Sequence, residues 1–320
     1  FIILSVSITS IIILSAKIIK SHFSPDSKIT KLKLLSFLIF LPILPNIYTE
    51  LHLGNINSVL LLIFIIALLY LLKGKDFKAS LLFALGILIK PHFLIFLPLL
   101  LFRKKFKCVI YTVTGIFVGI MLPALYTGMN YNVELHKQWL RTMLVHNDSL
   151  ISGQYTVYSW IYRCAGHFFF LDTLHYDKVF GIVIITVIAV AILLLLIFNF
   201  KKETSINSSQ SIRENNFVFE YFILLSLVPN ITVTDSEHFL LSIPLITFII
   251  NSLFENRVSI IYKIIAITCL VMFGMNMRDI VGRDISLMLS DYGILGLANF
   301  LIIIFCVVIH LKQIHQKTII

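Results

Sequence analysis

The stretch "ALGILIKPHFLIFLPLLLF", residues 84–102, consists almost entirely of hydrocarbon side chains, yet Lys90, Pro91 and His92 stand in its middle. A charged side chain at the centre of a membrane-inserted helix costs about 2.5–3.5 kcal/mol on insertion scales. Proline removes a helix hydrogen bond and clashes with the preceding turn. A single straight membrane helix over these residues is therefore unfavourable, and the neighbouring sequence must indicate how the stretch folds.

The composition predicts an all-α polytopic integral membrane protein. Of the 320 residues, 58% are hydrophobic and 13% are charged, whereas soluble domains are about 25% charged. The net charge of +10 comes from short basic clusters between apolar blocks, which is typical of orientation signals and not of a nucleic-acid partner. We expect a multi-pass protein of the cell (inner or plasma) membrane. The apolar blocks are residues 1–16, 34–48, 57–72, 79–102, 108–127, 178–200, 217–230, 238–254, 258–275 and 291–311.

The basic clusters orient the chain. The loops 17–33, 73–78 and 103–107 are rich in Lys and Arg, which places them in the cytoplasm, and residues 46–56 have neither, which places them outside. Two cytoplasmic clusters around residues 79–102 require an even number of crossings. Each half of that block is only about 16 Å long at 1.5 Å per residue, against a hydrocarbon core of about 30 Å. A re-entrant hairpin that bends at Lys90-Pro91 is therefore predicted, with Lys90 facing protein or a water-filled cavity.

One kinked helix is the alternative, and it would invert every later segment. With the hairpin, eleven of the later Lys and Arg residues fall inside and six outside, so the hairpin is favoured. Residues 128–177 then form an extracytoplasmic loop, whose Trp and Tyr residues suggest interfacial helices. We predict a single transmembrane domain over 1–320, with about nine spanning helices. Since the first block runs from outside to inside, a further span is expected before Phe1. The four cysteines form no CxxC pair, so neither a disulfide framework nor a metal site is predicted.

Polar residues gather at the predicted outer face. A lysine and an arginine near the headgroups suit a phosphate anion, and apolar surroundings suit a lipid tail. Each residue also has a plainer explanation, because asparagines cap helices, lysines extend toward the interface and histidines often lie there. The candidates for binding a phosphate or sugar are Asn55, Asn57, Lys90, His92, Gln154, Arg163 and His238, with Ser159, Asp235 and Glu237 beside them.

The order of these motifs resembles glycosyltransferase family 87. Gly54-Asn55-Ile56-Asn57 stands where that family has a GQxN-like turn, with Asn55 in place of Gln, and Lys90-Pro91 stands at its Lys-Pro position. The segment "GQYTVYSWIYRCAG" resembles the family's NQS-type segment, which ends in an arginine, here Arg163. "SEHFLLSIPLITFI" resembles its histidine-led span, here carrying His238 and Pro244. The resemblance extends from Leu51 to about Ile250.

The resemblance implies a GT-C fold and an inverting transfer. A hexose, mannose by analogy, would pass from a polyprenyl-phosphate donor to a lipid or glycan acceptor at the outer face, among membrane lipids and without a cofactor or metal. A carboxylate would act as general base, and cations would hold the leaving phosphate. In this fold class the base lies in the first outer loop, so it is expected upstream of Phe1. Glu50, Asp235 and Glu237 are the alternatives. A transporter or flippase for lipid-linked glycans is the rival function, although no internal repeat supports it.

Overall fold

A computed structural model describes residues 1–24, 29–146, 155–157, 159–160, 163, 210–231, 235–254, 259–276 and 278–319. Within these residues every regular element is a helix, as predicted. The elements are α1 (Ile2–Phe23), α2 (Ile29–Leu53), α3 (Asn57–Leu72), α4 (Asp76–Ile89), η1 (Pro91–Ile95), α5 (Phe96–Phe102), α6 (Phe106–Met121), α7 (Ala124–Thr127), α8 (Met129–His146), α11 (Gln210–Ile231), η4 (Ser236–Ser242), α12 (Ile243–Phe254), α13 (Ile260–Gly274), α14 (Arg278–Val281), α15 (Arg283–Asp291) and α16 (Ile294–Ile319).

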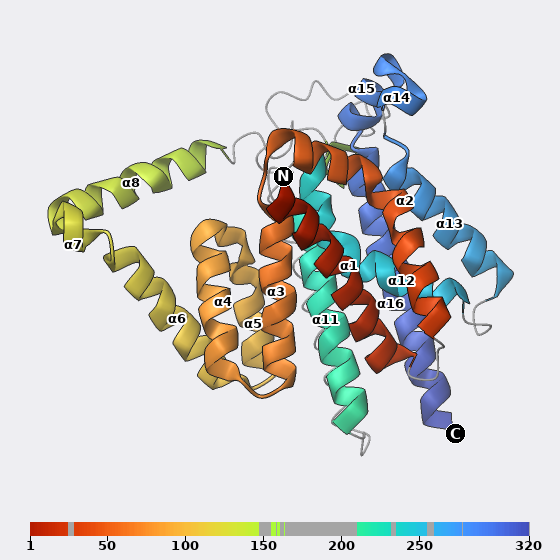
Figure 1. Cartoon of the computed structure of the whole chain (residues 1–320), viewed down its shortest axis with the longest axis horizontal. Helices are drawn as coiled ribbons and strands as arrows, with labels where there is room; N and C mark the ends of the chain where they lie inside the picture. The colour runs from red at the N-terminus through yellow and green to blue at the C-terminus, as the bar shows by residue number, and fades with distance from the viewer. Residues whose placement is uncertain are drawn as a thin grey trace.

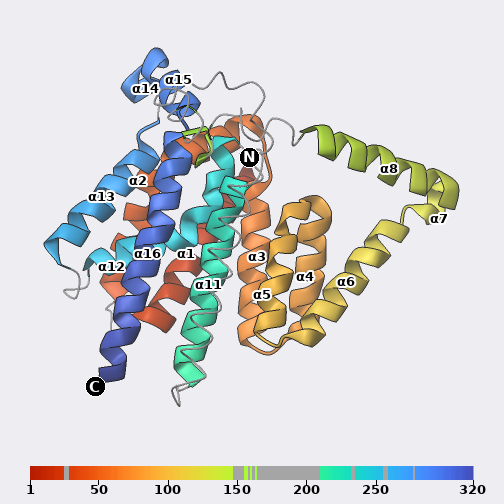
Figure 2. The same ribbon diagram turned by 180° about the vertical axis from the view of Figure 1, so that it is seen from behind.

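Most of the long helices run roughly side by side in a bundle (Figures 1 and 2). Five of the described helical segments are long and apolar enough to cross a membrane: Ile2–Phe23, Leu34–Leu53, Phe106–Thr127, Ser236–Phe254 and Ile294–Gln313. Three shorter apolar helices, Asn57–Leu72, Pro91–Phe102 and Ile260–Gly274, accompany them. The predicted block 178–200 lies outside the described residues. The protein is thus an all-α polytopic membrane protein.

The chain reverses direction at Lys90-Pro91. Helix α4 ends at Ile89, Lys90 is extended with φ −135° and ψ 101°, and Pro91 begins η1. A residue before proline is driven out of the helical region by contact with the proline ring, so the local sequence itself produces the bend. The connections from α3 to α4 and from α5 to α6 both lie at the lower end of the bundle in Figure 1, opposite the amino terminus. The predicted hairpin is therefore present.

Aromatic packing holds the hairpin against its neighbours. The ring centroid of Phe64 on α3 lies 4.1 Å from that of Phe93 and 5.1 Å from that of Phe96. Phe96 also lies 4.6 Å from Tyr221 on α11, whose hydroxyl donates to the Phe64 carbonyl at 2.8 Å. In lipid, close packing and interhelical hydrogen bonds replace the hydrophobic effect as the forces between helices. These contacts therefore stabilise the part of the hairpin that follows the bend.

A buried ion pair closes the other end of the hairpin. Arg103, directly after α5, donates from Nε and Nη2 to the two carboxylate oxygens of Glu220 on α11, at 2.8 and 2.6 Å. The Arg103 side chain is 11% exposed and that of Glu220 is 2% exposed. Two parallel bonds between a guanidinium and a carboxylate are the strongest geometry for such a pair. Arg103, which the sequence analysis used only to orient the chain, thus also binds α11.

Helices α6 and α8 leave the main bundle. Helix α6 packs on α4, where a Cβ added at Gly115 would lie 2.9 Å from the Cβ of Ala84. Small residues at such positions allow two membrane helices to approach closely. Helix α8 then lies across the direction of the bundle helices (Figures 1 and 2). It lies in the segment 128–177, for which interfacial helices are expected, and its interfacial location stays a prediction.

The hairpin leads to a topology prediction. In a protein whose four natural cysteines are replaced by alanine, single cysteines at Lys75 and Lys105 are expected to resist a membrane-impermeant thiol reagent added outside. A cysteine at the exposed Asp235 is expected to react with it and serves as the positive control. Both protected positions should react after the membrane is permeabilised. Labelling from outside at the Lys105 position alone would contradict a return to the cytoplasm.

Candidate functional site

The bend of the hairpin lies at the end of the bundle that also carries the amino terminus (Figure 1). Lys90 is half-buried there, between the first turn of α3 and the element η4. Its Nζ lies 2.6 Å from Oδ1 of Asn57 and 2.7 Å from Nε2 of His238. The three residues come from segments that lie far apart along the sequence. The structure therefore brings Lys90, Asn57 and His238 into one cluster.

Glu50 supports this cluster from α2. Its Oε2 accepts a hydrogen bond from Asn57 Nδ2 at 3.0 Å, and its Oε1 accepts one from the backbone N–H of Ser58 at 2.7 Å. The Ser58 N–H belongs to the first turn of α3, whose N-cap Ile56 provides no side-chain cap. A carboxylate is favourable at a helix N-terminus, because free N–H groups and the helix dipole are both positive there. Glu50 is fully buried, so both of its oxygens are used inside the protein.

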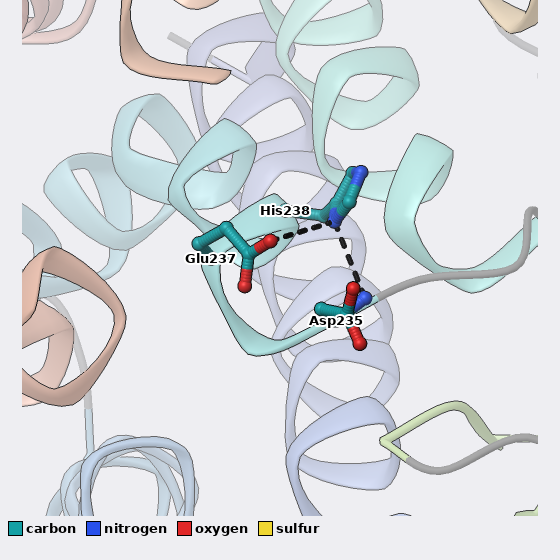
Figure 3. Close-up of side chains that lie close together, drawn as sticks. All are labelled: Asp235, Glu237 and His238. Atoms are coloured by element: carbon teal, nitrogen blue, oxygen red, sulfur yellow. Dashed lines mark hydrogen bonds and ion pairs between the residues drawn. The ribbon is translucent and has the colours of Figure 1, made fainter. Parts of the chain in front are cut away.

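The element η4 contributes the other polar residues. Asp235 precedes it and forms a capping box with His238, in which the Asp235 N–H donates to His238 Nδ1 at 3.2 Å. Glu237 Oε1 accepts from Asn55 Nδ2 at 2.5 Å and lies 3.8 Å from His238 Nδ1. Figure 3 shows that the side chains of Glu237 and His238 point toward each other above Asp235. Glu237 is fully buried and Asp235 is exposed, so the cluster reaches from the interior to the surface.

Two contacts from α2 set the position of η4. Asn46 Nδ2 donates to the Ser236 carbonyl at 2.5 Å, and the Ser236 hydroxyl donates to Thr49 Oγ1 at 3.1 Å. Asn46 is not among the site residues predicted from the sequence. A signal was present, because Asn46 and Glu50 are four residues apart in an apolar run and therefore share one face of α2. Buried amides and carboxylates in a membrane segment are rare and usually functional.

The hydrogen bonds of His238 define what the cluster can bind. Since Nδ1 accepts from the Asp235 N–H, a neutral imidazole carries its proton on Nε2. That Nε2 faces Lys90 Nζ at 2.7 Å, and an ammonium group is also a donor. Two hydrogen-bond donors that face each other without an acceptor are unfavourable, but both can donate to one oxygen of a bound anion. The pair is therefore suited to a phosphate or a carboxylate.

Asp235, Glu237 and His238 also have the spacing of a cation site. One potential ligand atom from each lies within 4.8 Å of the others. All three residues already have partners. His238 Nδ1 accepts from the Asp235 N–H, Glu237 Oε1 accepts from Asn55, and the Asp235 side chain accepts from the His238 backbone N–H. The Lys90 ammonium lies against the same imidazole, and it would repel a divalent ion at this distance. We therefore interpret Lys90 as the cation of this cluster.

Several buried polar atoms near the cluster have no hydrogen-bond partner in the described part of the chain. Glu237 Oε2, Asn46 Oδ1, Ser58 Oγ and His92 Nε2 are of this kind. Native proteins leave few such groups without a partner, and each one needs an explanation such as a ligand or a water molecule. His92 follows Pro91 directly, and its ring lies on Phe93 with a centroid distance of 4.8 Å. These polar atoms around the bend can therefore still form hydrogen bonds to a polar ligand.

The described residues around Arg163, from the segment 128–177, contact the helices near the carboxyl end of the chain. The Arg163 guanidinium lies over the ring of Tyr292 at 5.9 Å. Ser159 is buried with its Oγ 3.1 Å from Thr156 Oγ1, and the Tyr155 N–H donates to the Ser290 carbonyl at 3.0 Å. These contacts tie the segment to α15 and to the turn before α16. Gln154 lies outside the described residues, and the role of Arg163 at a phosphate stays a prediction.

The comparisons with known proteins agree with the motifs. The family model of glycosyltransferase family 87 matches residues 1–208, which include Asn55, Asn57 and Lys90, whereas His238 lies beyond the matched range. No curated protein matches this chain significantly, and no solved structure does. A match over 208 of 320 residues covers more than half of the chain. The resemblance inferred from the motifs is thereby confirmed, and the protein is a membrane glycosyltransferase that belongs to family 87.

Proposed function

We propose that the protein transfers a hexose, mannose by the family analogy, from a polyprenyl-phosphate donor to a lipid or glycan acceptor with inversion at the anomeric carbon. The reaction would take place at the outer face of the cell membrane. The observation that carries the proposal is the meeting of Lys90, Asn57 and His238 at one end of an apolar helix bundle. A lipid phosphate needs this combination of hydrogen-bond donors and hydrocarbon surroundings.

Lys90 and His238 would hold the phosphate of the donor. Negative charge develops on that phosphate as the bond to the sugar breaks, and preorganised donors stabilise it more strongly in the transition state than in the ground state. Asn57 holds Lys90 from the side, at 2.6 Å. Asn55, His92, Gln154 and Arg163 would contact the phosphate or the sugar. No nucleotide site is needed for such a donor.

The acceptor hydroxyl requires a general base, and the cluster offers three carboxylates. Glu50 uses both oxygens in the hydrogen bonds to Asn57 and Ser58, which makes it the least suited of the three. Glu237 keeps Oε2 without a partner among the described residues, and Asp235 is exposed. The outer segment 128–177 would complete the site as an extracytoplasmic loop with interfacial helices, in a single transmembrane domain.

A transfer assay tests the proposal. The full-length protein, purified in detergent, is expected to move radiolabelled mannose from polyprenyl-phosphate mannose to an acceptor lipid, and not from a nucleotide sugar. Proteoliposomes loaded with a lipid-linked glycan serve as the second arm. Movement of that glycan between leaflets without any sugar transfer would favour the transporter instead, and activity with the nucleotide sugar alone would contradict the proposed donor.

A further inference from the structure

Asn57 is the link between a buried carboxylate and Lys90. Its Nδ2 donates to Glu50 Oε2 at 3.0 Å, and its Oδ1 lies 2.6 Å from Lys90 Nζ. Glu50 and Asn57 are 0% and 1% exposed, so water does not replace either partner. The NH₂ group and the oxygen of the Asn57 amide therefore contact two different partners.

The charge of Glu50 determines which way this amide faces. A carboxylate only accepts hydrogen bonds, so the NH₂ group of Asn57 must point to Glu50 and its oxygen must point to Lys90. The reverse orientation would leave two oxygens opposed at Glu50 and two donors opposed at Lys90. Both oxygens of Glu50 are occupied, since Oε1 accepts from the Ser58 N–H at 2.7 Å. Each Glu50 oxygen thus already accepts one hydrogen bond, and Glu50 is 0% exposed, so it is poorly placed to reach an acceptor hydroxyl.

We propose that Glu50 is a positioning residue, which through Asn57 presents Lys90 to the phosphate of the lipid donor, and that it is not the general base. This inference rests on the proposed function. It assigns Glu50, which the sequence suggested as an alternative base, to the binding of the donor and not to deprotonation of the acceptor.

Counting donors predicts the effect of Glu50→Gln. The new amide oxygen can accept from the Ser58 N–H, but the new NH₂ then faces the NH₂ of Asn57. If Asn57 turns over to relieve this clash, its own NH₂ faces the Lys90 ammonium. Either arrangement loses one hydrogen bond of the series Glu50–Asn57–Lys90. Because hydrogen bonds to charged groups contribute more than neutral ones, we expect the binding of polyprenyl monophosphate to weaken about 10-fold or more.

The matched rescue is the exchange of carboxylate and amide, Glu50→Gln with Asn57→Asp. The Gln oxygen accepts from Ser58, the Gln NH₂ donates to one Asp oxygen, and the other Asp oxygen accepts from Lys90. Net charge and the number of hydrogen bonds are both restored. Asn57→Asp alone places two carboxylates side by side and should weaken binding. The double variant is therefore expected to bind better than either single variant, which a double-mutant cycle measures.

The experiment measures equilibrium binding of radiolabelled polyprenyl monophosphate to the full-length protein, and turnover with polyprenyl-phosphate mannose. Glu134→Gln on α8 is the control, because Glu134 is exposed and accepts a hydrogen bond from its helix neighbour Gln138 at 3.3 Å. Weakened binding in Glu50→Gln that the double variant reverses supports the inference. Should Glu50→Gln fail to fold, binding near the wild-type level in the double variant supports it equally.

Unchanged phosphate binding with lost turnover in Glu50→Gln, which is the behaviour of a base, would overturn the inference alone. A folded double variant that stays as weak as Glu50→Gln would do the same. A wild-type protein that binds no polyprenyl monophosphate would instead overturn the proposed function, and the inference with it. Unchanged binding and turnover in Glu50→Gln, together with loss in Lys90→Met, would refute the role of Glu50 and retain that of Lys90.

Discussion

Replacing Lys90 by methionine is expected to slow sugar transfer about 100-fold, the loss typical of removing one preorganised donor to a developing negative charge. Methionine has a similar length and no charge. Lys90 is half-buried beside Asn57 and His238, so its ammonium lies where the donor phosphate would bind. The measurement is the initial rate of transfer from polyprenyl-phosphate mannose by the full-length protein.

The same variant should still insert and fold. Lys90 is only half-buried, and methionine keeps the length and the apolar stem of the side chain, so the packing around the bend is largely retained. Lys73→Met is the matched control, because Lys73 is exposed at the opposite end of the bundle, in the turn between α3 and α4. Gel-filtration profiles of both variants should match that of the wild type. If Lys90→Met turns over at the wild-type rate, Lys90 is only a lysine that extends toward the membrane surface.

Glu220→Ala is expected to lower the free energy of unfolding by about 3–5 kcal/mol, which shifts the folding equilibrium roughly 100-fold or more. The variant removes the Glu220 carboxylate from the Arg103 guanidinium, which is only 11% exposed. The ion pair, one of the connections between the hairpin and α11, is lost at the same time. Unfolding in detergent, titrated with sodium dodecyl sulfate and followed by circular dichroism, measures the change.

A double variant separates the cost of an unpaired charge from the contribution of the pair. Arg103→Met with Glu220→Leu removes both charges and keeps apolar volume, so it should be far more stable than Glu220→Ala alone. Glu134→Ala, at an exposed position of α8, controls for loss of a carboxylate. Equal stability of Glu220→Ala and the wild type would show that water or lipid headgroups reach Arg103 and that the pair contributes little.

The membrane class and the bend of the hairpin could be predicted because both depend on local sequence. Apolar blocks of membrane length indicate membrane helices wherever they occur. Pro91 drives Lys90 out of the helical region independently of the tertiary contacts. The basic clusters before and after the block 79–102 required the chain to return to the same side. The resemblance to family 87 rested on the same local motifs, and the family match over residues 1–208 confirms it.

The gathering of polar residues at one end could also be predicted, but their partners could not. Orientation along the membrane follows from the charges of the loops, and it placed Asn57, Lys90 and His238 on one side. Which atoms meet depends on how the helices rotate and pack against each other. Lys90 and His238 are 148 residues apart, and no local pattern encodes such a contact.

The sequence by itself determined that this is a helical membrane glycosyltransferase with a hairpin bent at Lys90-Pro91. Only the tertiary structure decided what its charged side chains do. It bound Arg103 to Glu220 in the interior, laid Arg163 against Tyr292, and enclosed Glu50 behind Asn57. The physical reason is that the role of a charged side chain depends on its partners. Packing brings these partners within about 3 Å, where a hydrogen bond forms. In an apolar medium those partners are few, and long-range packing selects them.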